Sequence, residues 1–388
     1  MRVALVCDWL TAVGGAESVL LSLHQMYPDA PIYTSKYSPK NIDWFKDADV
    51  RTGFLQIFPN CLRRFISPLR QFYFSHLDLS DYDLVISVTG AEAKAVKTRK
   101  GKHLCYCHVP TQYYWGMYDD YIKNPGFGIL NPIARLGLRL LVKPLRKKDF
   151  AAAQQPDQFI TISSYAAELI NKYYKREAVV INPPANLDRI SSLTSVSRKN
   201  STTKGDFSTT KDHNSEKNQA KTKANYITTS RQVNWKRLDL CVKACIKTGD
   251  NLTLIGDGPE HSNLVRLAKG TSNIRFLPTM SQAELGQYLS TSDAFLFPSL
   301  EPFGLAPIEA MSAGIPVLAY QAGGALDYIE PDKNGIFFDK QTVSSLSNAM
   351  QKFKQNKWSP KEIKKSAEKY DQSVFKKKMR ELIDEKIH

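Results

Sequence analysis

Two carboxylates, Glu301 and Glu309, are the side chains whose type and spacing could do chemistry together. Glu301 falls in a Pro/Gly turn after the apolar run 294–297, and Glu309 in the opening turn of a predicted helix that ends near Gly314. Both acids should therefore face one crevice at the end of a strand, where open α/β sheets bind ligands. Because carboxylates repel phosphate, we expect these two to accept hydrogen bonds from hydroxyl groups.

A corner suited to an anion follows the next apolar strand, 316–320. Gly323 and Gly324 lead there into a predicted helix, whose free N–H groups suit a phosphate. A ligand with hydroxyl groups on both sides of a diphosphate would satisfy the acids and the glycines together. The pattern therefore predicts a nucleotide-sugar site.

Two cations stand at a similar position in the preceding part of the chain. Arg231 ends the predicted strand 226–229, and Lys236 lies in the first turn of the predicted helix after it. Cations normally avoid a helix N-terminus because of its dipole, so a bound diphosphate would explain their presence. The alternative is that both are solvated cations in a lysine-rich protein.

The two glutamates alone also have a plainer interpretation, in which Glu309 favours its helix N-terminus and Glu301 is a solvated turn residue. The frame around them, S-L-E-P-F-G-L-A-P-I-E-A-M-S-A-G-I-P-V, is longer and more specific. It resembles the signature of the retaining glycosyltransferases of family GT4, which have the GT-B fold. This resemblance implies an α/β chain with two Rossmann-like parallel-sheet domains that face each other across a cleft.

The resemblance also implies roles for individual residues. Glu309 would bind the ribose diol, Glu301 the hydroxyls of the donor sugar, and the R-x4-K pair the diphosphate. Glu301, Arg231 and Lys236 would thus take part in catalysis. The further donor contacts that it implies are Gly14, Gly15, Leu277, Phe303, Gly304, Leu305, Gly323 and Gly324.

The chain begins with a predicted buried strand, 3–7, a loop, 8–15, and a helix, 16–26. Gly14 and Gly15 lie at the strand-to-helix turn, where backbone can approach a ligand closely. The turn lacks the G-x-G-x-x-G pattern, which argues against a dinucleotide-dependent dehydrogenase. Its wording, D-W-L-T-A-V-G-G-A-E, resembles the opening of the mannosyltransferase-like members of GT4, although two glycines could simply form the turn.

A histidine ends the predicted strand 104–108. This strand belongs to a series, with others at 82–88, 159–163 and 179–181, that alternates with helical stretches and indicates a parallel, Rossmann-like sheet. His108 lies at the ligand end of its strand, where it can donate to a sugar hydroxyl or to the departing oxygen. A lone histidine is more often structural, but H-x-P here resembles the active-site histidine of the family.

The segment after His108 is aromatic, and aromatic faces with hydroxyl rims suit sugar stacking. We therefore expect acceptor contacts from Tyr113, Tyr114 and Trp115. Relatives usually continue H-x-P-x-R-Y-x-W-D. This chain has Gln112 in place of the arginine and Gly116 in place of the aspartate. Because these two positions depart from the family pattern, the resemblance does not fix the acceptor or the level of activity.

The length of 388 residues suits two domains. We predict an N-terminal acceptor domain, 1–182, a nucleotide-sugar domain, 183–370, and a C-terminal helix, 371–388, that returns to the first domain, as the resemblance implies. Within the second domain, residues 191–224 are rich in Ser, Thr, Lys and Asn and are expected to form a disordered insertion.

The composition narrows the remaining classes of protein. Six cysteines lie mostly in apolar segments without zinc-ribbon spacing, so free thiols in a reducing cytoplasm are expected rather than disulfides or a metal. The net charge is +15, but no nucleic-acid recognition motif is visible. No apolar run is long enough to cross a bilayer, and no secretory signal is visible.

Two segments, 131–148 and 352–388, carry much of the positive charge. The first interleaves cations with leucines and reads as a basic amphipathic helix. It could rest on an anionic membrane surface or pack on its own domain through its leucines, and the sequence favours neither. We expect a cytoplasmic protein, with the inner face of the membrane as a second location.

The resemblance thus implies a retaining hexosyltransferase, and no cofactor is expected. No D-x-D pair is evident in a donor-binding position, so the cations and helix N-termini would take the place of a metal. Overall similarity suggests transfer of mannose from GDP-mannose to a glycan or lipid-linked acceptor in cell-surface polysaccharide or glycolipid synthesis. A UDP-hexose donor remains open, as does a nucleotide-sugar-binding subunit without catalysis. A phosphorylase of the same fold would need a lysine-bound pyridoxal phosphate.

Overall fold

A computed structural model describes residues 1–59, 66–123, 125, 128–187 and 223–387 of the chain. It divides into two compact units. Unit 1 comprises Met1–Pro184 together with Gln372–His388, and unit 2 comprises Ala185–Asp371. Most of the predicted insertion, 191–224, lies outside the described residues.

Unit 1 is built on a parallel sheet in the order β3-β2-β1-β4-β5-β6-β7. Its central strands are buried runs of apolar residues, as expected where helices cover both faces of a sheet. The strands are β1 (Val3–Cys7), β2 (Ile32–Thr34), β3 (Val50–Thr52), β4 (Leu84–Thr89), β5 (Lys102–Cys107), β6 (Gln158–Thr161) and β7 (Ala178–Val180).

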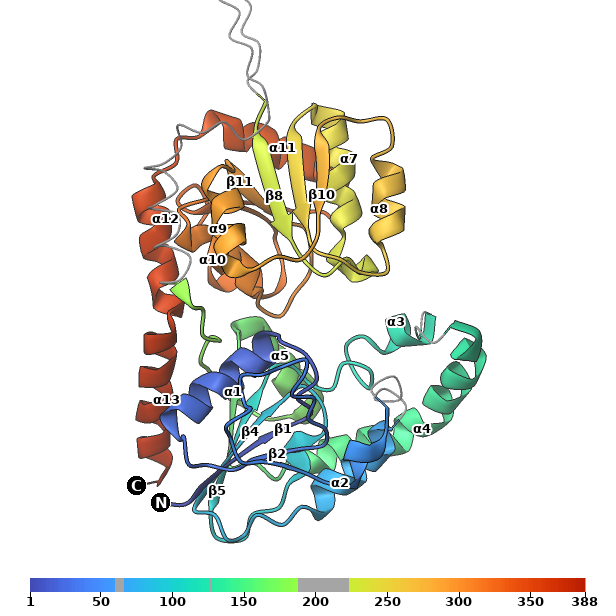
Figure 1. Ribbon diagram of the computed structural model, residues 1–388, viewed down its shortest axis with the longest axis vertical. Helices are drawn as coiled ribbons and strands as arrows, with labels where there is room; N and C mark the ends of the chain where they lie inside the picture. The colour runs from blue at the N-terminus through green and yellow to red at the C-terminus, as the bar shows by residue number, and fades with distance from the viewer. Residues whose placement is uncertain (60–65, 124, 126–127, 188–222, 388) are drawn as a thin grey trace, which may run out of the picture. The chain divides into compact units, whose positions relative to one another are not determined.

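Helices connect these strands (Figure 1). They are α1 (Gly15–Met26), η1 (Phe54–Ile57), α2 (Ser67–His76), η3 (Ala93–Ala95), α3 (Tyr118–Lys123), η4 (Gly128–Leu130), α4 (Asn131–Ala152) and α5 (Ser164–Tyr174), where η denotes a 3-10 helix. The C-terminal α13 (Gln372–Ile387) also belongs to this unit. It lies beside α1, and its Phe375 ring packs edge-on against Tyr106 of β5.

Unit 2 repeats the architecture, with a parallel sheet in the order β10-β9-β8-β11-β12-β13. Its strands are β8 (Asn225–Thr229), β9 (Asn251–Ile255), β10 (Ile274–Leu277), β11 (Ala294–Phe297), β12 (Val317–Tyr320) and β13 (Gly335–Phe338). Its helices are η5 (Asn234–Lys236), α7 (Leu238–Thr248), α8 (His261–Leu267), α9 (Gln282–Ser290), α10 (Leu305–Ser312), η6 (Gly323–Asp327), α11 (Val343–Gln355), α12 (Pro360–Ala367) and η7 (Glu368–Tyr370).

Most of the predicted strands and helices are confirmed, generally within two residues at each end. Two strands, 3–7 and 294–297, match to the residue. The sequence did not reveal β2, β3 or β13, which have three or four residues each.

Candidate active site

The strand order of both sheets contains a topological switch point, the place where ligands bind in open α/β sheets. In unit 1 it lies between β1 and β4, and in unit 2 between β8 and β11. The segments after these four strands carry many of the residues predicted from the sequence. Each unit therefore has its own candidate site.

In unit 2, an ion pair links the two sides of the switch point. Lys236, after β8, bonds through Nζ to the carboxylate of Glu301, after β11. The Ser299 hydroxyl donates to the other Glu301 oxygen at 2.6 Å. Both members of the pair remain partly accessible, at 16% and 12% side-chain exposure, so a ligand can reach them. The structure thus brings together a predicted phosphate ligand and a predicted hydroxyl ligand.

The two cations occupy different settings. Arg231 is exposed just beyond the end of β8. Lys236 closes the 3-10 turn η5 rather than standing in the first turn of the following helix, as predicted, because Arg237 adopts a left-handed conformation and α7 begins only at Leu238. The Lys236 ammonium lies 4.6 Å from the centroid of the Trp235 ring, a favourable cation–π distance.

Glu309 lies in the second turn of α10 rather than in its opening turn, and it is half-buried. Burial raises the pKa of its carboxyl group, so the folded protein disfavours the charged form. The helix begins after Gly304, whose φ of +98° suits glycine and whose added Cβ would lie 2.6 Å from the Phe297 ring. Leu305 opens α10 and is half-buried.

The Gly323–Gly324 corner is built differently from the prediction. The segment that it opens is the five-residue 3-10 helix η6, not an α-helix. The N–H of Gly324 donates to the carbonyl of Glu301 at 2.8 Å, so this donor already has a partner. A Cβ at Gly323 would lie 2.4 Å from the Glu301 carbonyl, and one at Gly324 would lie 2.3 Å from that of Pro302. The glycines therefore allow the loop carrying Glu301 to pack closely.

Two further predicted donor contacts of unit 2 hold the framework. Phe303 is buried, its ring packs edge-on against Tyr328 and Tyr370, and its carbonyl accepts the Tyr328 hydroxyl at 3.0 Å. Leu277 ends β10, half-buried, and its carbonyl accepts the Gly256 N–H at 3.0 Å. A direct contact of either side chain with a donor stays a prediction.

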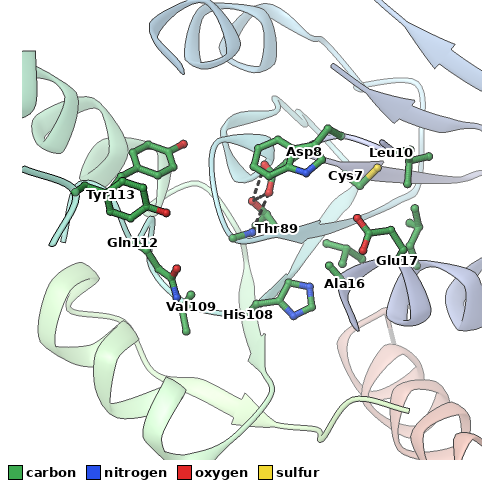
Figure 2. Close-up of a pocket in the computed structure, with 15 residues that line it drawn as sticks. Cys7, Asp8, Leu10, Ala16, Glu17, Thr89, His108, Val109, Gln112 and Tyr113 are labelled. Carbon is green, nitrogen blue, oxygen red and sulfur yellow. Dashed lines mark hydrogen bonds between the residues drawn. The ribbon is translucent and has the colours of Figure 1, made fainter. Parts of the chain in front are cut away.

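In unit 1, a pocket of about 320 Å³ opens at the carboxyl ends of β1, β4 and β5 (Figure 2). His108 and Gln112 contribute to its wall, as does Tyr113. Residues not predicted to take part complete it: Cys7, Asp8, Trp9, Leu10, Ala16, Glu17, Leu20, Val88, Thr89, Gly90, Val109 and Tyr121. The switch-point rule, applied to the end of β4, would have pointed to Thr89 and Gly90.

His108 lines this pocket. Its Nε2 atom is buried and has no hydrogen-bond partner among the described residues. Burial lowers the pKa of the imidazole to about 4, so the ring is neutral near pH 7. A buried nitrogen without a partner costs free energy unless a ligand satisfies it.

Asp8 anchors the floor of the pocket through four hydrogen bonds. Its carboxylate accepts hydrogen bonds from the Thr89 hydroxyl at 2.9 and 3.0 Å (Figure 2), from the Gly90 N–H at 2.9 Å and from the Ala93 N–H at 2.8 Å. Burial is the main cause that raises the pKa of Asp8, and the negative charge of the nearby Glu92 is the next. Together they outweigh the effect of these hydrogen bonds. The sequence offered one signal, since an acid directly after a buried first strand sits at the ligand edge.

The Gly14–Gly15 turn starts α1, with Gly14 as the exposed N-cap in an extended conformation. An added Cβ at Gly14 would lie 2.9 Å from Oε2 of Glu17, so a carboxylate stands beside this turn. The predicted contact with a donor diphosphate would therefore meet a negative charge, and it stays a prediction.

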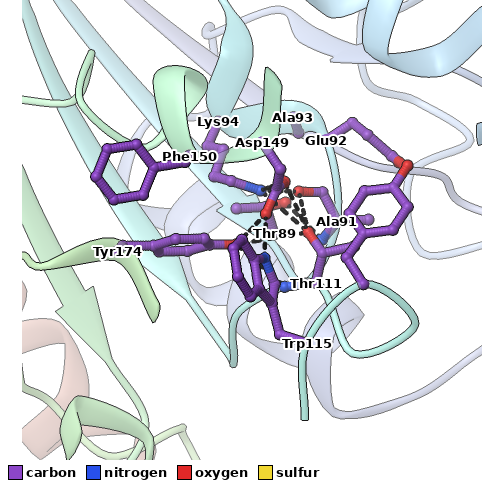
Figure 3. A network of polar contacts seen from close by, with 12 residues as sticks. Thr89, Ala91, Glu92, Ala93, Lys94, Thr111, Trp115, Asp149, Phe150 and Tyr174 are labelled. Carbon is purple, nitrogen blue, oxygen red and sulfur yellow. Dashed lines mark hydrogen bonds and ion pairs between the residues drawn. The ribbon is translucent and has the colours of Figure 1, made fainter. Parts of the chain in front are cut away.

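The three aromatic residues expected to contact an acceptor form hydrogen bonds within unit 1 through their polar groups. The Tyr113 hydroxyl donates to Glu92 at 2.5 Å, and Tyr114 is buried with its hydroxyl bonded to Ser67. The Trp115 Nε1 donates to Asp149 at 2.8 Å (Figure 3). Of the three, only Tyr113 lines the pocket, so an acceptor role is favoured for it alone.

Known proteins resemble this chain in sequence and in fold. Residues 210–370 match the family model of glycosyl transferases group 1. This match covers most of the sequence of unit 2. The sulfoquinovosyl transferase of Arabidopsis thaliana is 34% identical over 137 residues, 33% of this chain and 27% of that protein. The GDP-mannose-dependent phosphatidylinositol monomannoside mannosyltransferase of Mycobacterium tuberculosis is 27% identical over 113 residues, 26% of this chain and 29% of that one. These alignments span about a third or less of each relative.

The fold resemblance covers almost the whole chain. The HepE protein of Anabaena, crystallised with UDP, superposes with a TM-score of 0.66 at 17% identity, over 99% of this chain and 100% of that one. Sucrose-phosphate synthase from Thermosynechococcus elongatus also gives a TM-score of 0.66, at 17% identity over 99% of each chain. The GT-B fold expected from the sequence is confirmed.

The basic helix α4 is the last feature singled out in the sequence. Val142 and Leu145 are buried, but Ile133, Leu136 and Leu140 are 67%, 60% and 68% exposed. Packing of this helix on its own unit therefore leaves much of its apolar surface uncovered. The second basic segment, 352–388, is divided between the two units. Among the described residues, no helix is long and apolar enough to cross a membrane.

Proposed function

We propose that the chain is a retaining hexosyltransferase that takes its donor, a nucleotide-sugar, into the switch-point crevice of unit 2. The observation that carries this proposal is the Lys236–Glu301 ion pair at the switch point of unit 2, in a segment that matches glycosyl transferases group 1. In the bound complex Lys236 and Arg231 neutralise the diphosphate. Glu301 accepts hydrogen bonds from hydroxyls of the sugar, and Glu309 accepts hydrogen bonds from the ribose diol.

The reaction breaks the bond between the anomeric carbon and a diphosphate oxygen. The acceptor oxygen then bonds to that carbon on the same face, and the acceptor proton passes to the leaving diphosphate. Negative charge grows on the diphosphate during this step, so the two cations stabilise the transition state more than the ground state. No metal takes part in this proposal. His108 supplies a neutral imidazole that hydrogen-bonds a hydroxyl of either sugar.

Mannose from GDP-mannose is the donor that we propose, because the D-W-L-T and C-Y-C-H-V-P segments resemble mannosyltransferase-like enzymes. The similarity to a GDP-mannose-dependent relative supports the same choice. The alternative is a UDP-hexose, which the resemblance in fold to a UDP-bound protein makes worth testing. We propose a glycan or a lipid-linked saccharide as the acceptor.

Thermal unfolding with GDP-mannose, UDP-glucose, UDP-galactose and UDP-GlcNAc tests the donor. A ligand at 100 times its dissociation constant stabilises the folded state by about 2.7 kcal/mol, which corresponds to a rise in Tm of roughly 5–11 °C for a domain of this size. Lys236→Ala should abolish most of the rise. Lys243→Ala is a matched control, since Lys243 is also paired, with Asp239 at 3.0 Å, but on α7 away from the crevice.

The second candidate is a nucleotide-sugar-binding subunit without catalysis, favoured by Gln112 and Gly116 at positions where relatives differ. Slow hydrolysis of the bound nucleotide-sugar, without any acceptor, separates the two. Hydrolysis that disappears in Glu301→Gln, while the Tm without ligand is kept, supports the transferase. Tight binding without detectable hydrolysis or transfer would support the subunit.

We also propose that α4 rests on an anionic membrane surface, which places the protein at the cytoplasmic face. Exposed Leu136 and Leu140 stand on the same helix as the exposed cations Arg139, Lys143 and Lys147. Each buried leucine contributes up to about 1.5–3 kcal/mol, and each cation near an anionic surface about 1 kcal/mol. The two terms together suffice for reversible binding.

Co-sedimentation of the full chain with vesicles checks this location. We expect binding to vesicles containing phosphatidylglycerol and little binding to pure phosphatidylcholine, with the bound fraction falling as salt rises. The variant Leu136→Ser/Leu140→Ser should lower the affinity at least tenfold. Val265→Ser is a control, because Val265 is 42% exposed on α8. Equal binding to both kinds of vesicle would contradict the proposal.

A further inference from the structure

The pocket of unit 1 differs from the crevice of unit 2 in its charge. Among the described residues that line it, Asp8 and Glu17 are the charged side chains, and none is a lysine or an arginine. Asp8 directly follows β1, and Glu17 lies in the first turn of α1 (Figure 2). The pocket wall thus offers an anionic ligand no counter-charge of its own.

Arg70, a cation behind the wall, is already neutralised. The Arg70 guanidinium lies 5.0 Å from the centroid of the Trp9 ring, but its Nε donates to the Glu92 carboxylate at 2.8 Å. Another of its nitrogens donates to the Tyr113 hydroxyl at 3.1 Å. Burial alone would raise the pKa of Glu92, but Arg70 outweighs it and holds this pKa below its usual value, so the pair is ionised.

The remaining polar groups of the pocket suit hydroxyls. The buried Nε2 of His108 has no partner among the described residues. Glu17 accepts hydrogen bonds, and Gln112 both donates and accepts them. Trp9 and Tyr121 add aromatic surface against which the apolar face of a ring can pack.

We propose that this pocket selects an uncharged, polyhydroxylated ring, such as a neutral sugar, as the acceptor group and rejects rings bearing phosphate or carboxylate. The proposal rests on the proposed function, since it names the acceptor class of the same enzyme. An anionic ring would lose its hydration and meet Asp8 and Glu17 without a compensating cation. A neutral ring exchanges water for His108, Glu17 and Gln112 at little cost.

The test uses the full chain without nucleotide and two aryl glycosides of similar size, p-nitrophenyl mannoside and p-nitrophenyl glucuronide. Binding is followed by isothermal titration calorimetry. We expect the neutral glycoside to bind at least about tenfold more tightly than the glucuronide. A tenfold difference in affinity corresponds to about 1.4 kcal/mol of binding free energy. Trp9→Ala should weaken the binding of the mannoside, which assigns the binding to this pocket.

Two variants probe the charge directly. Gln112→Arg places a cation in the pocket wall and should raise the affinity for the glucuronide at least tenfold, while that for the mannoside changes little. Glu17→Gln should also reduce the preference for the mannoside over the glucuronide. Glu168→Gln removes one carboxylate from an exposed position of α5 and should change neither affinity.

Three results would overturn the proposal. They are glucuronide binding as tight as mannoside binding in the unmodified protein, an unchanged preference in Gln112→Arg, and no saturable binding of the mannoside. The failure of the proposed function would look different, because it would show as absent stabilisation by every nucleotide-sugar. That measurement reports on unit 2 and does not depend on the glycosides.

Discussion

Asp149→Asn tests whether a buried ion pair holds the loop that forms one wall of the unit 1 pocket. The Asp149 carboxylate accepts four hydrogen bonds (Figure 3). They come from the Lys94 ammonium at 2.6 Å, the Thr111 hydroxyl at 2.9 Å, the Trp115 Nε1 at 2.8 Å and the Tyr174 hydroxyl at 2.8 Å. Thr111 and Trp115 flank the pocket residues Gln112 and Tyr113, so the network fixes both ends of this segment.

The expected loss of stability follows from burial. The side chains of Lys94 and Asp149 are 1% and 0% exposed. Burial alone would lower the pKa of Lys94, but Asp149 outweighs it and holds this pKa well above its usual value. Asn keeps the shape and removes the charge, which leaves a buried ammonium without its counter-ion. Breaking a buried pair in this way costs about 3–5 kcal/mol, a large share of the roughly 5–15 kcal/mol that holds a domain folded.

The assay is urea unfolding of the full chain, followed by tryptophan fluorescence and circular dichroism. Asp149→Asn should lower the free energy of unfolding of unit 1 by about 3–5 kcal/mol. Glu381→Gln breaks the exposed pair with Lys377, 3.9 Å apart on α13, and should cost less than about 1 kcal/mol.

A double variant separates charge from packing. Lys94→Met/Asp149→Asn removes both charges but keeps a side-chain oxygen that can accept from the neighbouring donors, so it should recover part of the loss. If Asp149→Asn costs no more than Glu381→Gln, or if the double variant is at least as unstable as the sum of its single variants, the reasoning is wrong.

Three other outcomes follow from the site. His108, with its pKa lowered to about 4, takes up a proton more readily when unfolded, so it contributes stability that falls as the pH drops from about 6.5 to 4; urea unfolding should show a smaller loss over this range in His108→Asn. Glu309 has a raised pKa, so its charged form destabilises the fold at neutral pH; Glu309→Gln should raise the Tm at pH 7 while weakening nucleotide-sugar binding by calorimetry. Gly324→Ala places a Cβ 2.3 Å from the backbone of Pro302 and should cost about 1–3 kcal/mol in urea unfolding, whereas Gly116→Ala has nothing within 4 Å and should be nearly neutral.

The sequence predicted the framework because buried parallel strands are continuous apolar runs. Residues 294–297, for example, read as a strand without any knowledge of their neighbours. It also predicted that Lys236 and Glu301 share a site, since each follows a predicted strand and the carboxyl ends of parallel strands meet at one edge. Strand order, which places β8 beside β11, came only from the structure.

Other parts of the site could not be read from the sequence, for a physical reason. A charged residue looks the same in a sequence whether it is solvated or buried against a partner. Glu92, Lys94 and Asp149 are each at most 1% exposed, yet their partners come from segments distant along the chain. The aromatics 113–115 were predicted to face an acceptor because nothing local shows that their polar ends are taken by this network.

The charges of the two switch points assign the two halves of the proposed reaction. Unit 2 offers Lys236 and the exposed Arg231, so it can hold a diphosphate. The unit 1 pocket offers Asp8 and Glu17, which raise the cost of an anion there. Because Glu17 also lies beside Gly14, that glycine turn is a poor place for a phosphate. The leaving group must then be stabilised mainly by the side chains of unit 2, and unit 1 is left to bind and orient hydroxyls.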